Sequence, residues 1–208
     1  MNSEKLRGLY VITDPVLCKS NLNDMVEQAI LGGAEIIQYR NKNTDRQQQY
    51  NEAKALKTLC QQHDKIFIVN DNIDLAIEAD ADGVHLGQTD ANIQDARQRL
   101  GSNKIIGITC HSDIEAAKAA QRQSADYVAF GRFYPSKTKP SAPPAKIDIL
   151  QQAKAQIQIP IVAIGGISVE NAPTLLKAGA DMLAVINAIF AQDNIQQAAR
   201  KFTELFLA

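Results

Sequence analysis

The stretch IVAIGGISVENAPTLLKAGADMLAVI, residues 161–186, holds one full copy of the pattern that runs through this chain. A short β-branched run at 161–165 precedes an amphipathic segment at 172–178. A junction of small residues, Gly179-Ala180-Asp181, then leads into a second β-branched run at 182–186. Short apolar runs that alternate with helical periods are typical of parallel strands joined by helices. The stretch therefore predicts a βαβ unit.

Similar junctions recur earlier in the chain, at Gly33-Ala34-Glu35, Ala81-Asp82-Gly83 and Ser124-Ala125-Asp126. Glycine suits the left-handed conformation that ends a helix, and small residues let a helix approach a sheet closely. Each junction therefore indicates a point where a helix stops and a buried strand begins.

The same pattern along the whole chain gives eight strand candidates, at 9–13, 36–40, 66–70, 83–87, 104–109, 127–131, 161–165 and 182–186. Helical patterns between and after them include 22–31, 46–62, 114–122, 172–178 and 195–206. Eight βα units without a linker predict one α/β domain over residues 1–208, a compact (β/α)8 TIM barrel. The stretch 133–144 carries four of the seven prolines and is expected to form a lid-like loop.

The composition excludes several classes of partner. Apolar residues make up 45% of the chain and its formal net charge is −1, so no broad field attracts nucleic acid or an anionic membrane. We see no apolar membrane span and no signal peptide, and we expect a cytoplasmic protein. The three cysteines form no CxxC pair and are expected to be reduced and buried. The sequence leaves open whether the chain forms a homo-oligomer.

Barrels of this kind place their active sites where strands end and βα loops begin. After the second strand, Gln38, Arg40 and Lys42 share one face, while Ile37 and Tyr39 take the other. Two cations converging at the barrel mouth would repel each other unless an anion lay between them, which favours an anion clamp over a solvated strand end.

Two carboxylates follow the next two strands. Asn70-Asp71 ends the third strand and Asp90 follows the fourth. Mg²⁺ takes one or two protein carboxylates together with substrate phosphate oxygens, so the pair predicts a magnesium site. The alternative is that each aspartate only caps the helix that follows it.

Later loops add groups that bind phosphate. The lid carries Ser136-Lys137-Thr138-Lys139, strand seven ends at Gly165-Gly166, and strand eight ends at Ile186-Asn187. Loops after strands seven and eight commonly cradle a phosphate in such barrels. By a rough count, Arg40, Lys42, Lys139 and Mg²⁺ give about +5 and the two aspartates about −2, which a diphosphate of about −3 balances. We therefore expect a transferase with two phosphate sites.

At this point the sequence resembles the thiamine phosphate synthase family, also called thiamine phosphate pyrophosphorylase, over essentially the whole chain. The resemblance is carried by Gln38-Tyr39-Arg40-Asn41-Lys42, Asn70-Asp71, the run 83–88 with Asp90, Ser136 to Lys139, and the run 163–167. It implies that 4-amino-2-methyl-5-(diphosphooxymethyl)pyrimidine is joined to a carboxylated thiazole phosphate. The products would be thiamine phosphate, diphosphate and CO2.

The resemblance also implies residue roles. It assigns the pyrimidine diphosphate to Gln38, Tyr39, Arg40, Asn41, Lys42, Asn70, Thr109 and Lys139. It assigns the thiazole phosphate to Ser136, Lys137, Thr138, Gly166, Ile186 and Asn187, and Mg²⁺ to Asp71 and Asp90. Among these, Arg40, Lys42 and Lys139 are the catalytic candidates, because they would stabilise the departing diphosphate. Thr109, Asn187, Arg132 and Ser136 depart from the residues usual in the family.

Three other functions are compatible with parts of this pattern. Thiazole tautomerases share this barrel and use a histidine in a loop similar to that of His111, but they have no use for a diphosphate clamp. A non-catalytic barrel that binds a phosphate ligand would not need the clamp and the aspartate pair together. A phosphosugar isomerase or aldolase could use the same fold, but Schiff-base chemistry would need a lysine within a strand, and the predicted strand interiors contain none. We interpret His85 as a hydrogen-bonded core residue.

Overall fold

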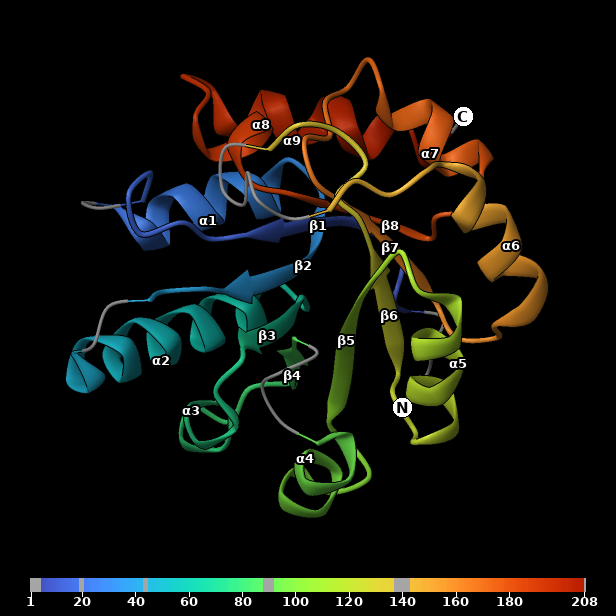
Figure 1. The fold of residues 1–208 in the computed structure, drawn as a ribbon. Coiled ribbons are helices and arrows are strands. Elements are labelled where there is room, and N and C mark those ends of the chain that lie inside the picture. The colour runs from blue at the N-terminus through green and yellow to red at the C-terminus, as the bar shows by residue number, and fades with distance from the viewer. Residues whose placement is uncertain (1–4, 19–20, 43–44, 88–91, 137–142, 208) are drawn as a thin grey trace.

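The computed structural model describes residues 5–18, 21–42, 45–87, 92–136 and 143–207. Its strands are parallel and close into a barrel in chain order, with the first strand paired to the eighth. The strands are β1 (Gly8–Ile12), β2 (Ala34–Tyr39), β3 (Ile66–Asn70), β4 (Gly83–Leu86), β5 (Ile105–His111), β6 (Tyr127–Phe130), β7 (Ile161–Ile164) and β8 (Met182–Val185). Figure 1 shows the helices arranged around them.

The helices of the described residues follow the strands in turn. They are α1 (Leu22–Leu31), α2 (Arg46–Gln62), α3 (Ile73–Glu78), α4 (Ile93–Leu100), α5 (Ile114–Arg122), α6 (Asp148–Gln156), α7 (Ala172–Lys177), α8 (Asn187–Phe190) and α9 (Ile195–Glu204). The predicted (β/α)8 TIM barrel is confirmed. Each strand begins and ends within two residues of its prediction, and α1, α2 and α5 have the predicted bounds.

The core has two layers. Inside the barrel, Tyr10, Ile36, Ile68 and Tyr127 pack in one cluster, and a larger cluster fills the space between the strands and the helices. Both faces of most strands are therefore buried, which explains their nearly continuous apolar runs. The three cysteines are free and buried, as predicted.

The junctions that repeat in the sequence hold the amino-terminal ends of the strands together. At three of them an aspartate carboxylate accepts a hydrogen bond from a backbone N–H at the preceding strand and pairs with a basic side chain of the helix that leads into that strand. The contacts are Asp82 with Phe67 N (2.8 Å) and Lys57, Asp126 with Ile106 N (2.7 Å) and Arg97, and Asp181 with Ile161 N (2.9 Å) and Lys154. Each aspartate thus ties an even strand to the odd strand before it.

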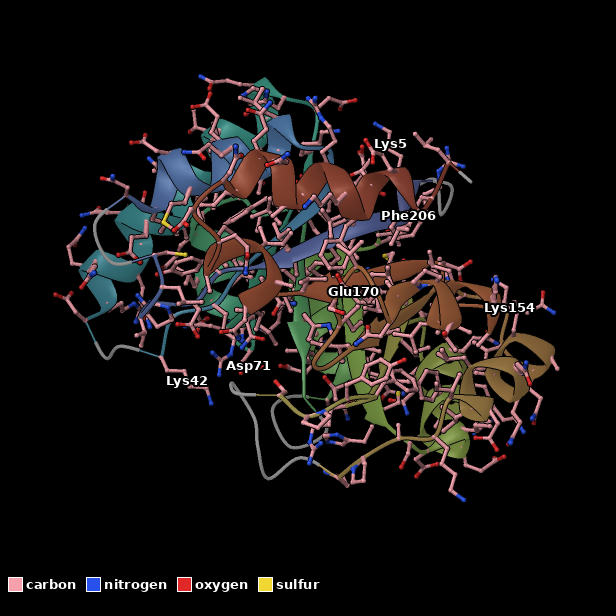
Figure 2. The ribbon with its side chains drawn as sticks, turned by 90° about the horizontal axis from the view of Figure 1, so that it is seen from above. Lys5, Lys42, Asp71, Lys154, Glu170 and Phe206 are labelled. Atoms are coloured by element: carbon pink, nitrogen blue, oxygen red, sulfur yellow. The ribbon has the colours of Figure 1, made fainter. Side chains whose placement is uncertain are left out.

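The two ends of the barrel differ in what they carry. Lys5, which precedes β1, lies near the amino-terminal ends of the strands, and Figure 2 shows Phe206 close to it in that view. Lys42 and Asp71, which follow β2 and β3, lie away from Lys5 and Phe206 in the same view.

Within the described part of the chain, no helix combines the length and the apolar character that a membrane crossing requires.

Candidate active site

A cavity of about 580 Å³ opens where the strands end. Its walls come from the carboxyl ends of the strands and the loops that follow them, and we call it the rim cavity. The structure brings the following predicted site residues to it: Gln38, Arg40, Lys42, Asn70, Asp71, Thr109, Ser136, Gly166, Ile186 and Asn187. Groups that are far apart in the sequence therefore meet around one space.

The end of β2 is fixed by its neighbour β1. The backbone N–H of Arg40 donates to the hydroxyl of Thr13 at 2.9 Å, and that hydroxyl donates to the Arg40 carbonyl at 3.4 Å. Gln38 is buried, Arg40 is half-buried and Lys42 is exposed, and all three line the rim cavity. The alternation predicted for this strand end is confirmed.

Tyr39 and Asn41 do not line the rim cavity, and their expected contact with the pyrimidine substrate stays a prediction. The Tyr39 hydroxyl donates to Glu52 Oε2 on α2 at 2.6 Å, and Asn41 Nδ2 donates to the same oxygen at 3.0 Å. Both line a separate hollow of about 240 Å³ between β2, α2 and the segment after β1, and Arg40 lines it as well. Burial, together with the adjacent Glu52, raises the pKa of Tyr39 well above its usual value. Alternation along the strand explains the difference, because odd and even residues point to opposite faces.

Asn70 and Asp71 form a bonded pair at the end of β3. Asn70 Nδ2 donates to Asp71 Oδ2 at 2.6 Å, and the Asp71 backbone N–H donates to the His85 carbonyl at 2.8 Å. Asp71 has φ of 62°, a left-handed conformation that aspartate tolerates better than most residues. Its carboxylate is exposed at the rim cavity, and carboxylate oxygen is a donor that suits Mg²⁺.

Gly166 lets the loop after β7 approach the segment that follows β6. Its φ is 64°, and a Cβ at this position would lie 2.3 Å from the Pro135 carbonyl oxygen and 2.8 Å from Tyr134. Two backbone hydrogen bonds hold the same segments together, from Phe133 N to Ile164 O at 3.2 Å and from Tyr134 N to Gly165 O at 3.0 Å. A side chain at position 166 would disrupt this wall.

Four predicted site residues, Lys137, Thr138, Lys139 and Asp90, lie outside the described residues. The predicted lid at 133–144 is described only over 133–136 and 143–144. The structure therefore describes Arg40 and Lys42 of the predicted anion clamp and Asp71 of the predicted magnesium site.

Sequence reasoning gave Tyr10, His111 and Arg132 no role in the transferase reaction, although all three line the rim cavity. His111 is the last residue of β5 and Arg132 follows β6, so the rule that located the other residues could have included them. Nothing in the sequence distinguishes Tyr10, because both faces of β1 are buried. His85 has the hydrogen bonds predicted for it, and it also reaches the cavity.

Comparison with known proteins decides the family. A family model described as thiamine monophosphate synthase matches residues 9–189. The chain belongs to that family. A thiamine-phosphate synthase of Alcanivorax borkumensis is 47% identical over 210 residues, covering 99% of this chain and 97% of that protein. One of Nitrosospira multiformis is 48% identical over 202 residues, covering 97% and 86%.

Solved structures agree with this assignment to the thiamine monophosphate synthase family. Thiamine phosphate pyrophosphorylase from Pyrococcus furiosus superposes with a TM-score of 0.89 at 36% identity, covering 98% of this chain and 96% of that one. The corresponding protein from Bacteroides thetaiotaomicron, at 17% identity and a TM-score of 0.69, shares the fold. The chain is therefore an enzyme, a transferase with thiamine-phosphate synthase activity. The tautomerase and non-catalytic alternatives gain no support.

Proposed function

We propose that the rim cavity joins 4-amino-2-methyl-5-(diphosphooxymethyl)pyrimidine to a carboxylated thiazole phosphate. The bond between the pyrimidine methylene carbon and the diphosphate oxygen breaks first, and the diphosphate leaves with the electron pair. The electron-rich aminopyrimidine stabilises the resulting cation, and the thiazole nitrogen then attacks the methylene carbon. Loss of CO2 from the thiazole carboxylate leaves its electron pair on the ring carbon, which takes a proton from solvent to give thiamine phosphate.

In this proposal Arg40 and Lys42 stabilise the departing diphosphate, together with Lys139. Three cationic side chains, Arg40, Lys42 and Arg132, line the described part of the cavity, where Asp71 is the carboxylate among the lining residues. Charges fixed in place before the reaction stabilise developing negative charge without reorganisation. This excess of positive charge at one rim is the observation that carries the proposal.

Asp71 and Asp90 would hold Mg²⁺ beside the diphosphate. The exposed Asp71 carboxylate and its Asn70 neighbour supply the hard oxygen ligands that this ion prefers, and the substrate would supply phosphate oxygens. When bound, the ion neutralises part of the leaving group's charge. Asn70 orients the Asp71 carboxylate through their hydrogen bond.

The thiazole phosphate would bind at the opposite wall, against Ser136, Gly166, Ile186 and Asn187, with Lys137 and Thr138 nearby in sequence. Ile12, Val162 and Ala184 make part of the cavity wall apolar. Such walls exclude water, which would otherwise trap the pyrimidine cation before the thiazole nitrogen reached it. We place the reaction in the cytoplasm, where charged phosphate substrates of this kind are retained.

Incubation of the purified protein with each substrate alone and with both tests the proposal. Release of diphosphate that requires both substrates and Mg²⁺ is the expected result. Isomerisation of a thiazole phosphate without diphosphate release would indicate a tautomerase instead, and binding without turnover would indicate a sensor. Either of these results overturns the proposal.

A further inference from the structure

A continuous run of hydrogen bonds crosses the floor of the rim cavity. Gln38 Nε2 lies 2.6 Å from the Tyr10 hydroxyl, which lies 2.8 Å from the Tyr127 hydroxyl. The Tyr127 hydroxyl lies 2.9 Å from His85 Nδ1, and His85 Nε2 lies 2.9 Å from Thr109 Oγ1. We call these five residues, from β1, β2, β4, β5 and β6, the polar chain.

Four residues of the polar chain line the cavity and one lies beneath it. Gln38, Thr109, Tyr10 and His85 line the cavity, whereas Tyr127 is fully buried and does not. Tyr127 fits there because Gly107 lies beside it in the barrel, where an added Cβ would come within 1.9 Å of the tyrosine ring. The Tyr127 ring also stacks on His85, with centroids 5.6 Å apart. The Tyr127 hydroxyl therefore lies behind the residues that line the cavity.

Proton counting gives the polar chain a direction. Burial raises the pKa of both Tyr10 and Tyr127 well above the usual value, so each keeps its single hydroxyl hydrogen. Each hydroxyl has two partners in the chain, and it satisfies both only by donating to one and accepting from the other. A neutral imidazole likewise donates through one ring nitrogen and accepts through the other.

Gln38 Nε2 donates to the Tyr10 hydroxyl. With that donor fixed, two satisfied hydroxyls require that Tyr10 donate to Tyr127 and that Tyr127 donate to His85 Nδ1. A neutral His85 then carries its hydrogen on Nε2 and donates to Thr109. Gln38 keeps its carbonyl oxygen as an acceptor for a ligand, and Thr109 keeps its hydrogen as a donor. Reversal of the whole chain would turn the Gln38 amide, so that its oxygen accepted from Tyr10 and its two N–H groups faced a ligand, and Thr109 would then offer an acceptor.

We propose that Tyr127 and His85 are positioning residues that set the donor and acceptor roles of Gln38 and Thr109 toward the pyrimidine substrate. An aminopyrimidine has the complementary pattern, since its amino group donates and a ring nitrogen beside it accepts. A 4-oxo pyrimidine has the opposite pattern and requires the reversed chain. The inference rests on the proposed function for the identity of this substrate, and it makes the polar chain a determinant of specificity.

Tyr127→Phe tests the proposal, because it removes one hydroxyl from the middle of the chain and keeps the ring that packs against Gly107. We expect the KM for the pyrimidine diphosphate to rise about tenfold, as for the loss of a buried hydrogen bond. The KM for the thiazole phosphate should stay within twofold, and a 4-oxo analogue should lose much of its disadvantage as a competitor. Tyr50→Phe on α2 is the matched control, and its kinetic constants should equal those of the wild type. An unchanged KM for the pyrimidine in Tyr127→Phe would overturn the proposal.

Nitrogen-15 NMR of the histidine rings in the wild-type protein gives a second readout that does not depend on turnover. We expect His85 to carry its hydrogen on Nε2 alone, and Tyr127→Phe to shift it toward a mixture of tautomers. A doubly protonated His85, or a hydrogen on Nδ1, contradicts the direction assigned to the chain. Absence of turnover in the wild type would count against the proposed function instead, and this spectrum would still decide the direction of the chain.

Discussion

At the scale of single residues, the site depends on backbone positions that are fixed before any ligand arrives. Thr13 bonds both backbone polar groups of Arg40, so the guanidinium extends from an anchored point at the rim. Gly166 fills a place that admits no side chain. Each of these residues supports a prediction for one of the two proposed phosphate sites.

Arg40→Ala should lower kcat/KM for diphosphate release by about 10² to 10³, the usual cost of removing one preorganised electrostatic contact. Circular dichroism and the thermal midpoint should stay close to the wild type, because the side chain is only half-buried. Arg46→Ala, which removes an exposed arginine on α2 paired with Glu78, is the control and should leave turnover unchanged. A rate within threefold of the wild type in Arg40→Ala would remove this residue from the clamp.

Gly166→Ala should raise the KM for the thiazole phosphate at least tenfold and leave the KM for the pyrimidine diphosphate nearly unchanged. The added methyl group collides with the backbone at Tyr134 and Pro135 and displaces the proposed phosphate wall. Gly101→Ala is the matched control for backbone strain. Gly101 also has a positive φ, 82°, but has nothing within 4 Å of an added Cβ. Equal effects of the two substitutions on steady-state kinetics would show that backbone strain, and not the collision, is responsible.

At the scale of elements, the strands were predictable and the contacts between them were not. Periodicity located each strand, and alternation alone put Tyr39 on the face opposite Gln38 and Arg40, as the structure has it. The assignment of Tyr39 and Asn41 to the substrate came from the family resemblance and not from this alternation, and it stays a prediction. The polar chain joins residues as far apart in the sequence as Tyr10 and Tyr127, and no local pattern reports which buried hydroxyls will meet.

The aspartates of the repeated junctions should matter for stability and not for catalysis. Asp126→Ala removes the acceptor of the Ile106 N–H and the partner of Arg97, at the end of the barrel away from the rim cavity. We expect the free energy of unfolding in urea to fall by about 1–3 kcal/mol, the cost of leaving a buried donor unpaired. The kcat should not change.

Glu115→Ala is the control for this prediction, since it removes an exposed carboxylate that pairs with Lys118 one turn away on α5. Its effect should stay below about 1 kcal/mol, as for other surface ion pairs. If Asp126→Ala were as stable as Glu115→Ala, the junctions would not hold the strands together in the way we describe.

At the scale of the whole molecule, the barrel buries groups whose ionisation opposes folding at alkaline pH. Burial raises the pKa of the Cys60 thiol to about 12 and that of the Cys110 thiol to about 12, from 9.0. Between pH 9 and 12 the unfolded chain therefore loses these protons while the folded chain keeps them. Since the folded state then binds more protons, the free energy of unfolding falls as the pH rises.

Urea unfolding at pH 8 and at pH 10, under reducing conditions, checks this prediction. The loss of stability between the two pH values should be smaller in Cys60→Ala/Cys110→Ala than in the wild type, by roughly 1–3 kcal/mol. Lysines and tyrosines titrate alike in both proteins, so the comparison isolates the thiols. An equal loss in both would mean that the two thiols are not protected by burial.

The barrel as a whole brings the ends of β2, β3, β7 and β8 around one cavity, and the account depends on a diphosphate binding there. A crystal structure of the protein soaked with diphosphate and Mg²⁺ tests this most directly. We predict diphosphate in the rim cavity within hydrogen-bonding distance of Arg40 and Lys42, with the metal on Asp71. Diphosphate bound in the hollow between β2 and α2, or at the end of the barrel near Lys5, would contradict the account.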